Sequence, residues 1–298
     1  MANKWAGIFP AVWTPTNAAG GLLREALRTN LEFLKRRGVH GFMALGSTGE
    51  FQLLEFATRK HALEEIIESA GTLPVIANIS DLRSAQVTEL GKLSKRLGAA
   101  AVAVLPPYFY RLDQADLVEF FLRAADAAQL PLVLYNFPER TGVRLELETI
   151  SEVASRVPLL AVKQSGEDFE YHLPLLELAQ KEHFLVFTGA DTRLDEALAL
   201  GVGGSISGIA NALPDFMVEI FSAFENGAPE RADNAARRMR RLSALINRCW
   251  FPLNIAALMT ARELPVGEPK FPLSAMTRER YSELVNECRR LFEEWELD

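Results

Sequence analysis

Hydrophobic runs typical of β-strands alternate with helical patterns from the N-terminus to about residue 227. The eight runs cover residues 8–14, 41–46, 74–80, 100–107, 131–138, 159–165, 184–191 and 204–211. Polar residues do not alternate with hydrophobic ones inside them, which is typical of strands buried on both faces of a parallel sheet. Between the runs, residues such as Leu27, Leu31 and Leu34 recur at intervals of three and four and predict amphipathic helices. Eight βα units predict an α/β fold, a closed (β/α)8 TIM barrel.

The pattern changes after residue 227, where strand-like runs disappear. Helical patterns cover about 230–250, 252–263 and 277–296, with a break rich in proline and glycine at 264–272. We therefore expect a barrel at residues 1–227 and a C-terminal extension of three helices at 228–298. A doubly wound open sheet is the alternative, but the first run is not followed by the GxGxxG turn that many such folds carry.

Composition narrows the range of partners and surroundings. Hydrophobic residues make up 49% and charged residues 24% of the 298 residues, which is typical of a globular protein. The net charge of -7 argues against a nucleic-acid partner, and we interpret the basic group Arg237, Arg238, Arg240 and Arg241 as a solvated helix face or a subunit contact. Two cysteines are too few for a disulfide framework, and no run is long enough to span a membrane, so we expect a cytoplasmic protein.

Lys163 lies inside the hydrophobic run 159–165, where a charged group needs an explanation. Burying an unpaired ammonium is costly, and a buried lysine often loses its proton and becomes an amine nucleophile. Two simpler alternatives stay open: Lys163 lies at an exposed strand end, or it pairs with a carboxylate.

The run that ends at residue 46 is followed by Ser47, Thr48, Gly49 and Glu50. Glycine lets a backbone approach a ligand closely, and hydroxyls, free amides and the N-terminus of a following helix favour a carboxylate or phosphate. The alternative is an ordinary glycine turn that caps the next helix.

Tyr135 lies near the end of the fifth run, and Arg140 lies just after that run. A tyrosine hydroxyl at a strand end can relay protons, and a guanidinium group can hold a carboxylate. Because the fifth and sixth runs are expected to be neighbouring strands, Tyr135 and Lys163 should lie within about 5 Å laterally. The alternatives are a core aromatic for Tyr135, and for Arg140 a surface ion pair with Glu139 or Glu146.

The last two runs contribute glycines and small polar residues, among them Gly189, Asp191 and Ile206. Similar loops bind sugar phosphates in other barrels, but no basic residue accompanies them here. We therefore predict close approach of the backbone to a small polar substrate. The four histidines are not spaced as a metal site, and none is expected.

GSTGE from Gly46, YNFPERTG from Tyr135 and AVKQS around Lys163 stand in the order and spacing of three marks of a known family. Over nearly its whole length the sequence resembles the pyruvate-dependent class I aldolases and lyases typified by dihydrodipicolinate synthase and N-acetylneuraminate lyase. The resemblance implies that Lys163 forms a Schiff base with a 2-oxo acid, that Tyr135 relays protons, and that Ser47 and Thr48 hold the pyruvate carboxylate. It implies no cofactor beyond this covalent pyruvate imine, and a homo-oligomer, usually a tetramer.

The residues that would select the second substrate do not all match one branch of the family. Arg140 looks like the arginine that holds the carboxylate of aspartate semialdehyde in dihydrodipicolinate synthases. Phe109, however, stands where those enzymes use a second relay tyrosine supplied across a subunit contact, and Tyr110 is the candidate replacement. Asp191 fits a sugar-hydroxyl ligand, but Thr192 and Gly208 stand where a neuraminate lyase would have a glutamate and a serine.

We therefore expect a lyase that condenses pyruvate with an aldehyde, with aspartate semialdehyde favoured, as in 4-hydroxy-tetrahydrodipicolinate synthase. The alternatives are an aldolase for 2-keto-3-deoxy sugar acids or N-acetylneuraminate, and a catalytically silent barrel that binds a 2-oxo acid. The histidines and asparagine of the lysine-feedback site of some synthases have no evident match after Glu50 or around residues 80–84. We expect no inhibition by lysine.

Overall fold

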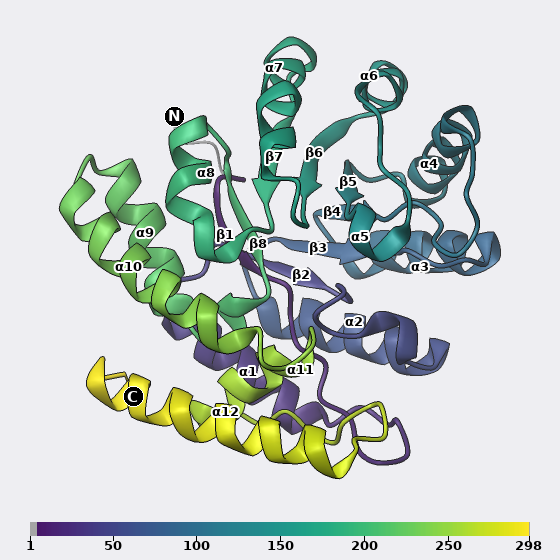
Figure 1. Cartoon of the computed structure of the whole chain (residues 1–298). Helices are drawn as coiled ribbons and strands as arrows, with labels where there is room; N and C mark the ends of the chain where they lie inside the picture. The colour runs from purple at the N-terminus through teal and green to yellow at the C-terminus, as the bar shows by residue number, and fades with distance from the viewer. Residues whose placement is uncertain (1–4, 298) are drawn as a thin grey trace.

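The computed structural model describes residues 5–297, and its centre is a sheet of eight parallel strands curled into a barrel (Figure 1). The strands are β1 (Gly7–Pro10), β2 (Phe42–Ala44), β3 (Val75–Asn78), β4 (Ala101–Val104), β5 (Leu132–Asn136), β6 (Leu159–Gln164), β7 (Leu185–Thr188) and β8 (Gly204–Ser207). From β2 to β8 each strand pairs with the next along the chain, and β8 also pairs with β1. A parallel bridge between Ala11 and Met43 joins β1 to β2 and completes the circle. The predicted (β/α)8 barrel is confirmed.

The strands are shorter than the hydrophobic runs that predicted them. β8 ends at Ser207, and the residues that follow form the short 3₁₀ turn Ile209–Asn211. β1 ends at Pro10, although Val12 and Trp13 beyond it are still buried. Hydrophobic residues past the strand ends are buried beneath loops and helices, so burial continues where sheet pairing has stopped.

Helices cover the outside of the barrel (Figure 1). Those that follow the strands are α1 (Arg24–Arg36), α2 (Phe56–Ala70), α3 (Ser84–Leu97), α4 (Gln114–Ala128), α5 (Pro138–Thr141), α6 (Leu147–Arg156), α7 (His172–Glu182), α8 (Leu194–Leu200) and α9 (Pro214–Glu225). Three more form the predicted C-terminal extension: α10 (Pro229–Ile246), α11 (Leu253–Ala261) and α12 (Ala275–Glu294). α10 lies beside α9, and α12 runs along α11 at the lower edge of the view (Figure 1). Within residues 5–297, no helix is both long and apolar enough to cross a membrane.

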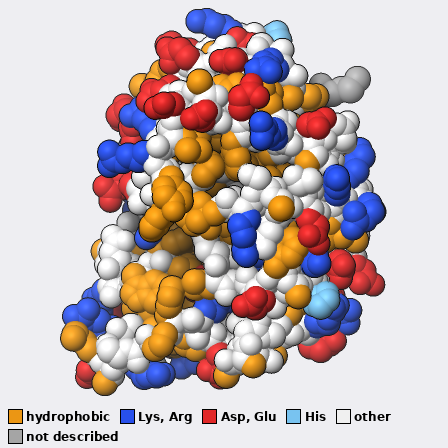
Figure 2. Space-filling model, turned by 90° about the vertical axis from the view of Figure 1, so that its right-hand side faces the viewer, with side chains coloured by type: hydrophobic (Ala, Val, Ile, Leu, Met, Phe, Trp, Pro, Cys, Tyr) orange, Lys and Arg blue, Asp and Glu red, His pale blue; other side chains and the backbone are white. Residues whose placement is uncertain are grey.

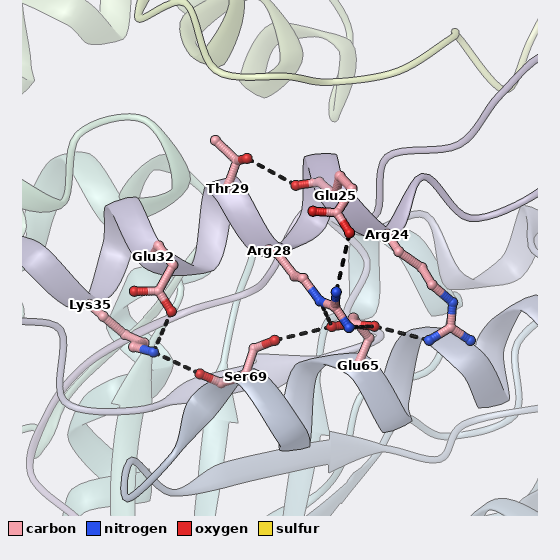
Figure 3. A network of polar contacts seen from close by, with 8 residues as sticks. All are labelled: Arg24, Glu25, Arg28, Thr29, Glu32, Lys35, Glu65 and Ser69. Atoms are coloured by element: carbon pink, nitrogen blue, oxygen red, sulfur yellow. Dashed lines mark hydrogen bonds and ion pairs between the residues drawn. The ribbon is translucent and has the colours of Figure 1, made fainter.

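A buried carboxylate joins the first two barrel helices (Figure 3). Glu65 on α2 is fully buried and accepts hydrogen bonds from Arg24 at 3.0 Å and from Arg28 at 2.5 Å, both on α1. Burial alone would raise the pKa of Glu65, but these hydrogen bonds outweigh it and hold the pKa below its ordinary value. The charge of Glu65 therefore favours the folded state at neutral pH.

Candidate active site

The pairing of β5 with β6 places Tyr135 directly beside Lys163, as the strand order predicted. Lys163 is only 5% exposed, and its Nζ lies 4.1 Å from the centre of the Tyr135 ring. Lys163 forms no ion pair with any of the described residues. An exposed strand end is therefore wrong for this lysine, and no described carboxylate lies within ion-pair distance of it.

Lys163 opens into a cavity of about 520 Å³ at the carboxyl ends of the strands. The face of the molecule turned toward the viewer in Figure 2 is hollowed between groups of hydrophobic side chains, and many charged side chains lie toward the periphery. Seven of the residues predicted from the sequence line the cavity: Thr48, Tyr135, Arg140, Lys163, Gly189, Asp191 and Ile206. The fold thus gathers residues from five separate chain segments around one amine.

Ser47 does not line this cavity. The Tyr135 hydroxyl is 3.5 Å from Ser47 Oγ, at the outer limit of a hydrogen bond. Ser47 lines an adjoining cavity of about 360 Å³, which Arg140 also lines. The hydroxyl pair therefore connects the lysine cavity to a second, neighbouring space.

The loop from Gly46 to Glu50 differs from the prediction in one respect. The predicted helix N-terminus does not follow it directly, because Phe51–Leu53 forms a 3₁₀ turn and α2 begins only at Phe56. Glu50 has a left-handed backbone, with φ 55°, so the chain changes direction between the loop and this turn. The loop offers hydroxyls and backbone amides, but no long helix dipole.

Gly49 does not line the cavity. A Cβ atom added to it would lie 2.7 Å from the carbonyl oxygen of Val12 and 2.8 Å from Thr14 Oγ1. The glycine is therefore needed for packing of the loop against the chain after β1.

Arg140, on the short helix α5, is exposed and lies near two aromatic rings. Its guanidinium carbon is 6.0 Å from the ring centre of Phe137 and 5.5 Å from that of Phe251. Arg140 has no ion pair within the described part of the chain, and the Glu139 carboxylate accepts a hydrogen bond from the Glu167 amide instead. A cation that faces a cavity without a carboxylate partner is suited to bind an anionic ligand.

The opposite wall comes from the ends of β7 and β8. Gly189 packs against Ser165: an added Cβ would collide with Ser165 Oγ and would also lie 3.3 Å from Lys163 Cε, so glycine lets this wall approach the lysine. The Asp191 carboxylate accepts hydrogen bonds from the Ile209 amide at 2.9 Å and from Ser205 Oγ at 3.3 Å. Burial raises the pKa of Asp191, although these bonds and the Lys163 charge act in the opposite direction. Much of its acceptor capacity is thus used within the protein.

Sequence reasoning missed the part of the cavity wall that the C-terminal helices supply. Asn247 and Phe251 lie between α10 and α11, and Asn254 and Ile255 lie on α11. These residues are more than 80 positions away from Lys163, and the helix predicted at about 230–250 placed Asn247 inside a helix, whereas α10 ends at Ile246. The expectation that no basic residue accompanies the last two strand ends is wrong, because Arg193 also lines the cavity; it is paired with Glu196 at 2.6 Å.

Phe109 and Tyr110 do not line the cavity of their own chain. They are 82% and 67% exposed, and their rings contact each other edge to face at 5.0 Å. Phe109 has a φ of 84°, which is rare for a residue with a side chain. No group of metal-ligating side chains occurs within residues 5–297.

Comparison with known proteins identifies the family. Residues 4–290 match the model of the dihydrodipicolinate synthetase family. A 4-hydroxy-tetrahydrodipicolinate synthase from Methanothrix thermoacetophila is 30% identical over 281 residues, which cover 93% of this chain and 94% of that protein.

Solved structures give the same picture. YagE, a prophage protein of the dihydrodipicolinic acid synthase family from E. coli K12 solved in complex with pyruvate, has a TM-score of 0.90 at 26% identity, over 96% of this chain and 98% of that one. A sialic acid aldolase from Ruminococcus gnavus, at 22% identity and a TM-score of 0.88 over 98% and 99% of the two chains, shares the fold. The family match over nearly the whole sequence decides the assignment: the chain belongs to the dihydrodipicolinate synthetase family of pyruvate-dependent class I lyases.

Proposed function

We propose that this enzyme condenses pyruvate with an aldehyde that carries a carboxylate, as a 4-hydroxy-tetrahydrodipicolinate synthase does with aspartate semialdehyde. The observation that carries the choice of aldehyde is Arg140, a cation without an ion-pair partner among the described residues that faces the cavity of Lys163. The names of the relatives that match nearly the whole chain support the same reaction.

Lys163 is the proposed nucleophile. Its Nζ adds to C2 of pyruvate and water leaves, which gives an iminium ion that withdraws electrons from C3. Loss of a C3 proton gives an enamine, and C3 then attacks the aldehyde carbon while a proton passes to the aldehyde oxygen. Water, or an amino group of the bound product, then adds to the imine carbon as Lys163 Nζ leaves, which releases the product and returns the amine. Because Lys163 is only 5% exposed, little bulk water reaches the imine and the enamine.

Tyr135 is the proposed proton carrier. Its ring lies against Lys163 Nζ, so its hydroxyl is close to the atoms on which protons are lost and gained. An isolated phenol with a pKa near ~10 is a weak base, and it needs a partner that can return its proton. The Ser47 hydroxyl, 3.5 Å away, is the first such partner. Phe109 cannot extend this chain, and Tyr110 of a second subunit is our candidate to do so.

Ser47 and Thr48 are the proposed site for the pyruvate carboxylate. Thr48 lines the cavity of Lys163. Ser47 lines the adjoining cavity, and its Oγ lies 3.5 Å from the Tyr135 hydroxyl. Hydrogen bonds from hydroxyls and backbone amides at this position would orient C2 of pyruvate toward Lys163. The loop would thereby hold the 2-oxo acid with its C2 atom aligned for attack by Lys163 Nζ.

We further propose a homo-oligomer, with a tetramer expected. The exposed Phe109 and Tyr110 rings support this, because two adjacent aromatic side chains left in water are typical of a contact surface. A cytoplasmic location is proposed as well, and the free thiols of Cys249 and Cys288 are compatible with it.

The experiment compares Arg140→Ala with Arg193→Ala, a matched variant of a cavity arginine that already has a carboxylate partner. Rates are measured with pyruvate and either aspartate semialdehyde or an uncharged aldehyde of similar length. We expect Arg140→Ala to lower kcat/KM for the acidic aldehyde by about tenfold or more, the loss of one charge-assisted contact. Arg193→Ala should have a much smaller effect.

Imine formation separates the two roles of the site. Reduction with borohydride in the presence of pyruvate, followed by mass spectrometry, should still label Arg140→Ala on Lys163. Equal loss of labelling and turnover would assign Arg140 to structure rather than aldehyde recognition. A wild-type preference for an uncharged sugar aldehyde would instead favour the sugar-acid aldolases, and labelling without turnover on any aldehyde would favour a silent binding barrel.

A further inference from the structure

Lys270 is a buried cation outside the cavity of Lys163. It lies in the connection between α11 and α12, and its side chain is 5% exposed. Its Nζ donates hydrogen bonds to Glu50 Oε2 at 2.6 Å and to the carbonyl oxygen of Thr14 at 2.9 Å. The Glu50 side chain is itself 7% exposed, so both charges are largely shielded from bulk water, and both line a cavity of about 350 Å³.

Stability alone does not account for this pair. Taking two charges out of water costs about as much as their attraction returns, so a buried ion pair is weak evidence for a gain in stability. Burial lowers the pKa of Lys270, while the Glu50 carboxylate opposes that shift. The Lys270–Glu50 pair is therefore better explained by the positions in which it holds the two chain segments than by a gain in stability.

The pair acts on the loop that ends at Glu50. Inside the loop, the amide of Gly49 bonds to the carbonyl of Gly46 and the amide of Glu50 to the carbonyl of Ser47, both at 3.1 Å. The loop is therefore a single tight turn, and the position of Glu50 determines that of Ser47 and Thr48. The second bond of Lys270, to Thr14, fixes the same ammonium to the chain that follows β1.

The connection that carries Lys270 is held at several points. The Trp13 indole donates to the carbonyl of Val266 at 2.8 Å, and the amide of Glu268 donates to the carbonyl of Thr16 at 2.7 Å. Asn30 on α1 donates to the carbonyl of Pro265 at 2.9 Å. The segment is thus fastened to the β1–α1 connection, and Lys270 projects from a fixed support.

We propose that Lys270 is a positioning residue for pyruvate: through Glu50 it holds the loop of Ser47 and Thr48 in the geometry that binds the carboxylate. The inference rests on the carboxylate role proposed above for that loop. It makes the C-terminal helices part of the pyruvate site, since α11 and α12 hold both ends of the connection.

The test uses Lys270→Met and the double variant Lys270→Met/Glu50→Gln. The single variant leaves a buried carboxylate without its cation and is expected to lose stability. The double variant removes both charges and is expected to recover much of that stability, so it remains measurable. Arg262→Met is the control, because Arg262 is a buried cation of the same C-terminal region that pairs with Asp215 at 3.1 Å, away from the loop.

The measurement is the pyruvate concentration that gives half-maximal borohydride labelling of Lys163, taken well below each variant's unfolding temperature. In the double variant we expect this concentration to rise about tenfold, which corresponds to the loss of one good hydrogen bond to the pyruvate carboxylate. Labelling at saturating pyruvate should persist. The control should lose stability and keep the wild-type concentration. The proposal is overturned if the double variant reaches half-maximal labelling at a pyruvate concentration within about twofold of wild type. Absence of labelling in the wild type would instead refute the proposed function.

Discussion

The two glycines of the Gly46–Glu50 loop should differ in their response to alanine: substitution of Gly49 should be damaging, and substitution of Gly46 should be tolerated. Gly49→Ala puts a Cβ at 2.7 Å from the Val12 carbonyl oxygen and 2.8 Å from Thr14 Oγ1. Gly46→Ala puts one no closer than 3.4 Å to Ala11 Cβ, an ordinary contact. Neither glycine has a φ in the left-handed region, so the backbone conformation suits alanine at both positions.

The size of the effect follows from these contacts. At Gly49 the Cβ is 2.7 Å from a backbone oxygen, against the 3.4 Å where ordinary contact begins, so the loop must retreat by about 0.7 Å. Overpacking of this kind costs about 1–3 kcal/mol of stability. A displacement near 1 Å in a substrate-positioning group can lower rates by about 100-fold, so we expect kcat/KM for pyruvate to fall by about 10- to 100-fold.

The assay is steady-state turnover at varied pyruvate, with unfolding of each variant followed in urea. Gly46→Ala should remain within about twofold of wild type in kcat/KM and lose no stability, because alanine restricts the unfolded chain without a clash. A Gly49→Ala enzyme with wild-type kcat/KM would refute the argument that packing against Val12 sets the loop position. Loss of activity in Gly46→Ala alone would place the critical backbone approach at the ligand instead.

Three further predictions concern other parts of the molecule. Tyr135→Phe should still trap pyruvate on Lys163 but turn over about 100-fold or more slowly, and wild-type turnover would remove its role as a proton carrier. Because the folded pKa of Glu65 lies below its ordinary 4.5, its stabilisation exists above that pH and is lost as the pH falls through the folded value. The urea midpoint of Glu65→Gln should therefore lie below wild type at pH ~7 and converge with it in acid; a constant difference would contradict the assignment. Millimolar lysine should leave turnover unchanged, and a dose-dependent loss would reveal a feedback site.

The barrel and the Lys163–Tyr135 pair could be predicted because they depend on local patterns. Buried parallel strands have continuous hydrophobic runs, and consecutive strands in a barrel are neighbours, so residues near the ends of successive runs lie side by side. The exact strand ends could not be predicted, because Val12 and Ile209 remain buried after sheet pairing ends. Hydrophobicity reports burial and does not distinguish a strand from a buried turn.

Contacts between distant segments were the other limit. Phe251 reaches the cavity, and Lys270 reaches Glu50, only because the C-terminal helices pack against the barrel, and neither residue belongs to a recognisable motif. The different demands on Gly46 and Gly49 were also hidden, because the motif shows two glycines and not the atoms that face them. The sequence indicated the reaction, and the structure was needed to see that Lys270 contacts the loop that ends at Glu50.

The central claim is that Lys163 forms an imine with pyruvate, and borohydride trapping tests it most directly. The wild-type enzyme is treated with pyruvate and borohydride, digested, and sequenced by mass spectrometry beside a Lys163→Met variant. We expect one reduced pyruvate adduct, on the peptide that contains Lys163, and none in the variant. An unmodified wild-type enzyme, or an adduct of equal yield on another lysine in the variant, would contradict the account.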